Sequence, residues 1–231
     1  MGNDFMDEFG MELPAIIKGN EPHMACLLLL DTSGSMTGDP IFELNEGIDR
    51  FKEEVCEDQT ARDVLDVAIV EFNSTNMPIQ KFTPVQFMEH INLQAGGGTN
   101  MSPAIRTAID MVMEQVDLYA KVGTQPYKPW IVMVSDGAPQ DDITEVAREI
   151  QNLEERGKLK FFSLGVGEYD SGVLHQLSGP KVMRLKNNDF RSFFNWLSKS
   201  MVSVSMSSPG EVPIGIPLPE NVDKDTNDWM A

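Results

Sequence analysis

Residues Ala25 to Met36 read ACLLLLDTSGSM and contain the clearest structural pattern of the chain. Their apolar residues form an unbroken run that ends abruptly at Asp31. A continuous apolar run of this length is typical of a strand covered on both faces, as the strands of parallel sheets are. We interpret the run as the first central strand of such a sheet, followed by the polar loop TSGSMTGD.

Strand patterns alternate with helical patterns along the rest of the chain. Helical spacing of apolar residues predicts helices at 40–55, 102–119, 142–155, 173–177 and 190–204. Runs rich in Val, Ile and Phe predict strands at 64–72, 130–134, 160–166 and 181–185, with a short edge strand at 77–82. This alternation indicates right-handed crossovers. We therefore predict an α/β fold: a doubly wound, mainly parallel sheet with helices on both faces and one short antiparallel edge strand.

The 231 residues, 41% of them hydrophobic, are sufficient for one sizeable core. We expect one domain at 22–206, between an acidic N-terminal arm at 1–21 and an acidic, Pro-containing C-terminal arm at 207–231. Such composition is typical of disordered segments. The alternative is that Phe5, Phe9 and Met11, or the stretch Ile214–Leu218, dock on the domain or on a partner.

Charge and composition exclude several classes of function. Eighteen basic against 36 acidic residues give a formal charge of −18, which repels the phosphate backbone of nucleic acids. The longest uncharged apolar run, Met24–Leu30, is too short to cross a membrane. Acidic residues within Met1–Glu12 argue against a secretory signal, so we expect a cytoplasmic protein. Cys26 and Cys56 have no spacing typical of a disulfide framework or a zinc site, and we expect two reduced, packed thiols.

Oxygen-bearing side chains follow three of the predicted strands or stand in the loops behind them. They are Asp31, Ser33, Ser35, Thr99 and Asp136. The carboxyl ends of the strands in an open parallel sheet share one crevice, so these residues should converge there. Two carboxylates and three hydroxyls are hard donors, which suit Mg²⁺ or Mn²⁺, with Ca²⁺ less favoured and zinc or copper unsuited.

The charge of this ligand set indicates what the site could bind. Two aspartates only balance a dication, and hydroxyls add no charge, so the ion would still attract one more anionic oxygen. A carboxylate from a partner protein would provide it. Gly34 would let the chain turn between Ser33 and Ser35, and Gly96–Gly98 would let the Thr99 loop approach closely.

The run from Asp31 to Met36, with Thr99 behind a glycine-rich loop and Asp136 in Ser-Asp-Gly, resembles the metal-ion-dependent adhesion site (MIDAS) of the von Willebrand factor A family. The resemblance covers roughly Met24 to Val204. It implies that Ser33, Ser35 and Thr99 contact the metal directly or nearly so. Asp31 and Asp136 would act directly or through water.

Within that family, the opening EPHMACLLLLDTSGSMTGDPIFELNEGI (residues 21–48) is similar to bacterial proteins of the TerY and YegL type, which are associated with tellurite-resistance and stress gene clusters. That similarity implies an intracellular bacterial protein that works beside phosphotransfer or stress-response partners.

These residues also have simpler interpretations. Asp31 or Asp136 could simply cap the helix that follows, and we leave Asp39 and Asp141-Asp142 out of the site as charges that favour helix starts. An enzyme using Asp31 for metal-assisted phosphotransfer is the main alternative. Ser33 stands where such an enzyme needs a second carboxylate, and no lysine is clearly placed to steady a phosphoryl group.

The remaining catalytic patterns are absent from the sequence. His23, His90 and His175 accompany no G-x-S-x-G motif, and no phosphate-binding loop carries its lysine. We therefore predict a non-enzymatic, metal-dependent protein-binding module without a catalytic residue. A third possibility is a scaffold that binds through its acidic arms.

Overall fold

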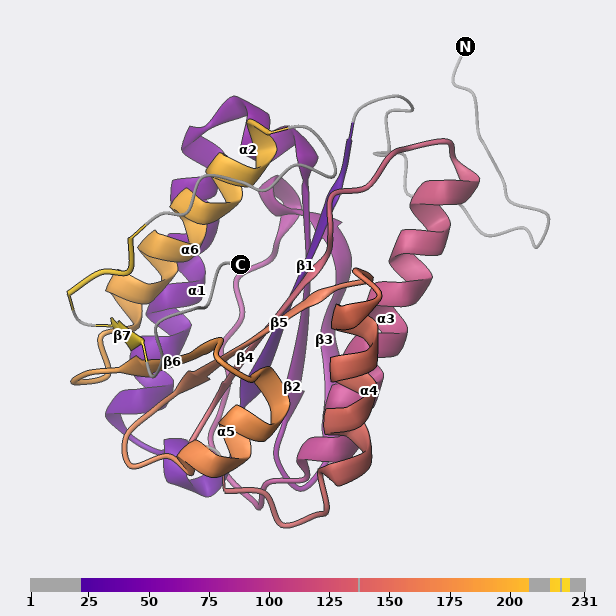
Figure 1. The fold of residues 1–231 in the computed structure, drawn as a ribbon. Coiled ribbons are helices and arrows are strands. Elements are labelled where there is room, and N and C mark those ends of the chain that lie inside the picture. The colour runs from indigo at the N-terminus through magenta and orange to yellow at the C-terminus, as the bar shows by residue number, and fades with distance from the viewer. Residues whose placement is uncertain (1–21, 137, 208–216, 221, 225–231) are drawn as a thin grey trace.

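The structure, a computed structural model, describes residues 22–136, 138–207, 217–220 and 222–224. Its centre is a 7-stranded sheet with the strand order β3-β2-β1-β4-β5-β6-β7 (Figure 1). β1 (Met24–Asp31) lies between β2 and β4 and pairs in parallel with both. The apolar run therefore forms a central strand, as predicted.

The described residues form alternating strands and helices. The other strands are β2 (Leu65–Phe72), β3 (Asn76–Pro84), β4 (Trp130–Ser135), β5 (Lys160–Gly165), β6 (Val182–Leu185) and β7 (Val222–Lys224). The helices are α1 (Asp39–Glu57), α2 (Gln59–Val64), α3 (Met101–Lys121), α4 (Thr144–Glu155), α5 (Ser171–Ser178) and α6 (Phe190–Ser205), with single 3₁₀ turns η1 (Gly34–Met36) and η2 (Val85–Phe87). Every predicted element is present, with ends that differ by a few residues.

Helices cover both faces of the sheet, which confirms the predicted fold class. Cys26, Leu28 and Leu30 of β1 belong to the core layer that α1 and α6 cover. Leu27 and Leu29 point the other way, into the layer formed with α3, α4 and α5. Figure 1 shows α1 and α6 on one side of the sheet and α3 and α4 on the other. The β1 run is buried throughout because both of its faces meet helices.

The two edges of the sheet are antiparallel, whereas the sequence predicted one such strand. β3 pairs with β2 as expected, and β7 pairs with β6 inside the segment interpreted as the C-terminal arm. β7 has only three residues, and it is stabilised by pairing with β6 and by the burial of Val222. No local sequence pattern therefore predicts it. α2 was also missed. Its six residues are too few for a helical repeat, and Asp58 caps it by accepting from the Ala61 N–H.

The predicted division into a domain at 22–206 and two arms stays a prediction. Residues 1–21, with Phe5, Phe9 and Met11, lie outside the described residues, as do Ile214 and most of 207–231. In the part of the C-terminal segment that is described, Leu218 and Val222 pack against the core layer under α1 and α6.

Both cysteines are free thiols in the elements where they were expected. Cys26 is buried in β1, and burial raises the pKa of its thiol to about 12. Cys56 is half-buried in α1. No helix within the described ranges is both long and apolar enough to cross a membrane.

Candidate metal centre

Three loops meet at the carboxyl edge of the parallel strands. We call them the serine loop (residues 31–37), the glycine loop (95–100) and the aspartate loop (136 and 138–143). The serine loop follows β1, the glycine loop precedes α3, and the aspartate loop follows β4. β1 and β4 are adjacent in the sheet, so the serine and aspartate loops start side by side.

Asp31 ends β1 and is completely buried. Oδ1 accepts a hydrogen bond from the Ser33 backbone N–H at 2.8 Å, and Oδ2 accepts one from Ser135 Oγ at 2.6 Å. Burial raises the pKa of this carboxyl group; the hydrogen bonds from Ser135 and Ser33 oppose the rise, and the charge of Asp136 adds to it. A cation beside Asp31 would therefore relieve the cost of burying its charge.

The two serines follow Asp31 in the serine loop. Ser33 Oγ and Ser35 Oγ are 3.0 Å apart, and Ser33 is buried whereas Ser35 is exposed. Gly34, between them, donates its N–H to the Gly97 carbonyl at 3.0 Å. A Cβ on Gly34 would lie 3.3 Å from that same oxygen, so a larger residue would push the two loops apart. Glycine therefore allows the serine and glycine loops to approach.

The glycine loop carries Thr99 alongside the serine loop. The Gly96 N–H donates to the Thr32 carbonyl at 2.8 Å, next to the Gly34–Gly97 bond. Gly97 adopts φ +80°, and a Cβ there would lie 2.8 Å from Ser74 Oγ, so this position too requires glycine. Thr99 itself is buried.

Asp136 begins the aspartate loop. The β1–β4 register pairs Leu30 with Val134, so Asp31 and Asp136 follow neighbouring strand ends. Asp136 is half-buried, and its charge is close enough to raise the pKa of Asp31. The two carboxylates are therefore close enough for their charges to interact. No described lysine or arginine forms an ion pair with either of them.

Asp141 connects the aspartate loop to the start of α3. Its Oδ1 accepts from the Met101 N–H at 2.8 Å and its Oδ2 from the Ser102 N–H at 2.7 Å. The Gln140 N–H donates to the Thr99 carbonyl at 2.9 Å. The sequence predicted a helix-start role for Asp141, and the structure shows it at α3, a helix that precedes it in the chain. Because α3 begins two residues after Thr99, this capping also anchors the glycine loop.

Replacing Asp141 by alanine is expected to weaken binding of Mn²⁺ about tenfold and to cost roughly 1 kcal/mol of stability, because outer supports position metal ligands and caps satisfy helix N–H groups. Calorimetric titration and urea unfolding would measure the two effects. Asp142→Ala is the matched control, since the Asp142 side chain accepts from the Thr144 N–H at 2.9 Å, beside the start of α4 and not of α3. Equal affinities for the two variants would contradict the anchoring role.

Several supports of the site were not predicted. Ser135 bonds to Asp31 only because β1 and β4 pair, although it stands next to Asp136 in sequence. Asn73 and Ser74, in the turn between β2 and β3, bind the other loops. Asn73 Nδ2 donates to Thr32 Oγ1 at 3.1 Å, and Ser74 Oγ accepts from the Gly98 N–H at 2.7 Å. A polar turn gives no signal of such distant partners.

The donor set in the three loops is made of oxygen. No cluster of three or more His, Cys, Asp or Glu side chains occurs among the residues that the structure describes. The histidines pair elsewhere: His23 with Asp66, His90 with Asp49, and His175 with the Gly179 carbonyl. Two carboxylates and three hydroxyls therefore fit a hard dication better than zinc or copper.

Solved structures share this fold at low sequence identity. The pilus adhesin SpaC from Lactobacillus rhamnosus GG matches at 14% identity with a TM-score of 0.65, over 80% of this chain and 31% of the adhesin. The vWF domain of the type V pili tip protein Mfa5 from Porphyromonas gingivalis matches at 10% identity with a TM-score of 0.57, over 83% of this chain and 98% of that domain.

Proximal thread matrix protein 1 from the mussel byssus, in a structure with a zinc-occupied MIDAS motif, matches at 17% identity with a TM-score of 0.53. That match covers 81% of this chain and 49% of the mussel protein. This chain therefore spans about half the length of the mussel protein and about a third of the adhesin. Likeness at such identities shows a shared fold.

These features describe an α/β domain whose mainly parallel sheet carries oxygen-bearing loops at its carboxyl edge. Residues 27–197 match the family model of the von Willebrand factor type A domain. The chain belongs to the von Willebrand factor A family. A comparison with curated proteins finds no match.

Proposed function

We propose that this chain is a non-enzymatic module that holds a divalent cation and uses it to bind a protein partner. The proposed ligands are Asp31, Ser33, Ser35, Thr99 and Asp136. The observation that carries the proposal is the buried Asp31 carboxylate, which lies near the charge of Asp136 and has no cationic partner among the described residues. Burying such an anion without compensation is costly, and a dication would offset that cost.

The residues of the site also favour a particular kind of partner. When bound, the cation supplies a positive centre for an anionic oxygen. Two aspartates and three neutral hydroxyls leave room for one more negative ligand, so we propose an Asp or Glu side chain of another protein. The fold shared with a pilus adhesin and a byssus matrix protein supports a role in protein binding.

We propose Mg²⁺ or Mn²⁺ as the ion. The mussel relative holds zinc in its MIDAS motif, so zinc is a reasonable competitor. Hydroxyl and carboxylate oxygens without imidazole or thiolate favour the harder ions. The cellular setting, a bacterial cytoplasm with stress-response or phosphotransfer partners as in tellurite-resistance systems, rests on the resemblance of residues 21–48 to TerY and YegL proteins and on the acidic N-terminal residues.

An electron paramagnetic resonance titration would test the site. The wild-type chain is expected to remove one Mn²⁺ per chain from the free-ion signal, and Asp31→Asn and Asp136→Asn are expected to remove little. Asp142→Asn, which changes the charge beside the site, should bind like wild type. Stoichiometric binding that survives both site substitutions would contradict the proposal.

The same preparations decide between binding and catalysis. With Mg²⁺ we expect no phosphate release from p-nitrophenyl phosphate and no phosphoryl uptake from acetyl phosphate. Turnover that is lost in Asp31→Asn would favour the phosphotransfer alternative. Partner capture would be compared between residues 24–204 and the full chain, each with and without chelator. Capture by residues 24–204 only in the presence of metal would assign binding to the metal site, and capture only by the full chain would assign it to the acidic arms.

A further inference from the structure

The amino edge of the sheet, at the opposite end of the strands from the metal centre, carries a group of basic side chains. The chain around the starts of β4, β5 and β6 contains the acidic residues Glu154 and Glu155 and a larger set of cations: Lys128, Arg156, Lys158, Lys160 and Lys181. These strands are parallel neighbours, so their first residues lie side by side. A basic surface therefore occurs on a chain whose formal charge is −18.

Three of these lysines, Lys128, Lys160 and Lys181, form what we call the lysine cluster. Lys160 begins β5, pairs with Trp130 in the β4–β5 register and places its Nζ 6.0 Å from the centre of the Trp130 ring. Burial lowers the pKa of Lys160, and the charges of Lys128 and Lys181 lower it further. The charge of Glu154 opposes this shift. The three ammonium groups are therefore close enough to repel one another, with one carboxylate beside them.

That carboxylate already has two partners. Glu154 Oε1 accepts from the Phe161 N–H at 2.8 Å, and Oε2 forms an ion pair with Lys181 Nζ at 3.0 Å. Neither Lys128 nor Lys160 forms an ion pair within the part of the chain that the structure describes. Because like charges at short range repel, a further carboxylate is favoured at the lysine cluster.

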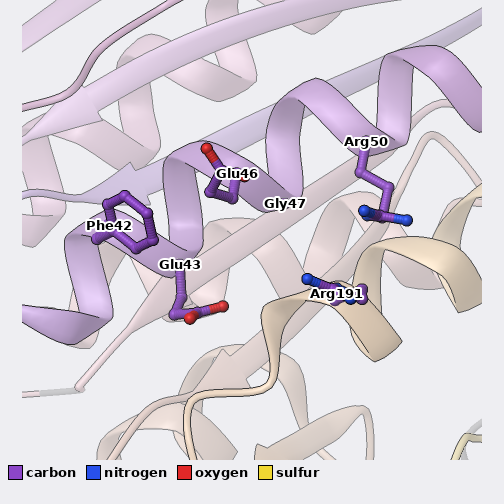
Figure 2. Close-up of a pocket in the computed structure, with 6 residues that line it drawn as sticks. All are labelled: Phe42, Glu43, Glu46, Gly47, Arg50 and Arg191. Atoms are coloured by element: carbon purple, nitrogen blue, oxygen red, sulfur yellow. The ribbon is translucent and has the colours of Figure 1, made fainter.

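The hollow between α1 and the start of α6 has a different balance of charge (Figure 2). It is lined by Phe42, Glu43, Glu46, Gly47, Arg50 and Arg191, so two glutamates balance two arginines. The start of α6 is capped by the Asp189 carboxylate, which accepts from the Ser192 N–H at 3.1 Å. The excess of positive charge therefore lies at the lysine cluster and not in this hollow.

The edge strand β7 leads the chain toward the lysine cluster. It lies beside β6 and runs antiparallel to it, from Val222 opposite Leu185 to Lys224 opposite Met183 (Figure 1). β7 therefore runs from the carboxyl edge of the sheet toward the amino edge. Met183 stands two residues after Lys181, so the chain leaves β7 within about two residues of the cluster.

The sequence that follows β7 is acidic. Residues 225–231 read DTNDWMA, with Asp225 and Asp228 and without a basic residue. They lie outside the described part of the chain. Three extended residues span about 10 Å, which is roughly twice the spacing of neighbouring strands and thus the separation of β7 from β5. An acidic residue at 225 is near enough to reach Lys181, and one at 228 is near enough to reach Lys160.

We propose that residues 225–228 of this chain dock on the lysine cluster. The Asp225 carboxylate pairs with Lys181, and the Asp228 carboxylate lies between Lys160 and Lys128. β7 has only three residues and so few hydrogen bonds of its own, and these contacts hold it on the edge of the sheet. The docking does not depend on the metal centre.

Zero-length cross-linking of the full chain with a carbodiimide tests this contact, because the reagent joins a carboxylate to an amine only when the two groups are in contact. In dilute buffer with EDTA, mass spectrometry is expected to find an amide between Asp228 and Lys160 or Lys128 within one chain. The Lys186–Asp223 ion pair, at 2.7 Å, is the internal positive control.

Two outcomes of the cross-linking would overturn the proposal. One is a cross-link at the control pair while Asp228 joins no residue of the lysine cluster. The other is cross-linking of the cluster to carboxylates of residues 1–21 or of a second chain, which would assign the surface to a different occupant.

Amide hydrogen exchange at residues 222–224 measures whether the contact holds β7. Asp228→Asn is expected to speed this exchange about threefold, as the loss of a surface ion pair would, and Lys160→Glu at least as much. The double variant Lys160→Glu/Asp228→Lys should return exchange to within about twofold of wild type, because the pair is restored with its charges reversed.

Glu220→Gln is the matched control, because it removes one exposed carboxylate from the chain just before β7. It should leave exchange at β7 unchanged. Equal exchange in wild type and Asp228→Asn, an equal increase in Glu220→Gln, or a double variant no better than Lys160→Glu would each contradict the docking.

Discussion

Saturating Mg²⁺ is expected to raise the free energy of unfolding of the wild-type chain by about 2.7 kcal/mol when the free ion is at roughly 100 times its dissociation constant. Asp31→Asn should remove this gain completely. The physical reason is that Asp31 is buried and has no cationic partner among the described residues, so its charge contributes most to attracting the ion. Urea unfolding at pH 7 with Mg²⁺ or with EDTA would measure the difference.

A comparison of the wild type with Asp31→Asn in the absence of metal provides a sharper test. The folded state raises the pKa of Asp31, so it holds this proton more tightly than the unfolded chain does. Stability from this group is therefore present below the unfolded pKa and is lost as the pH rises through the folded pKa. In EDTA at pH 7, Asp31→Asn should be as stable as wild type or more stable, whereas in Mg²⁺ the order should reverse. Unfolding curves of the wild type that are the same with and without Mg²⁺ would contradict the metal centre.

Replacing Asp66 by alanine is expected to cost about 3 kcal/mol, the largest loss that we predict for a single polar side chain of this protein. Asp66 lies in β2 and is 4% exposed. Its Oδ2 accepts from Tyr119 Oη at 2.5 Å and lies 3.0 Å from His23 Nδ1. Alanine would leave both of these buried polar groups without an acceptor. Urea or thermal unfolding would measure the loss.

Tyr119→Phe is the matched comparison, because it removes the hydrogen bond to Asp66 and leaves the Asp66 carboxylate beside His23. It should cost roughly 1.5 kcal/mol, and combining it with Asp66→Ala should give less than the sum of the two losses. Asp66 pairs with Ala25, six residues before Asp31 on β1, which is about 20 Å along the strand. Both variants should therefore keep the full Mg²⁺ response. A loss of that response would mean that this cluster and the metal edge are coupled.

Much of the fold could be predicted because its signals are local. The run before Asp31, the helical repeat of α1 and the apolar strand at Trp130 each bury a regular pattern of side chains, and the pattern is visible in the sequence. β7 and α2 could not be predicted in this way. Each is too short for a periodic signal and is stabilised by a neighbour, β6 in one case and the Asp58 cap in the other.

The candidate site shows the same division. The residue types at Asp31, Ser33, Ser35, Thr99 and Asp136 could be selected from the sequence, because their chemistry and their places behind strands are local properties. The residues that hold these side chains in place could not be selected in this way. Ser135, Asn73 and Asp141 act on residues that are 40 to 104 positions away, so their partners depend on which strands and loops become neighbours.

Consecutive residues are enough to predict that the apolar run forms a central parallel strand and ends at an oxygen-rich loop, because the burial of a strand on both faces is a local pattern. The contacts of Asp66 with His23 and Tyr119 arise only when the strands and helices assemble. These groups come from separate elements, and their contacts depend on helix packing and strand order, which no single stretch of the chain encodes.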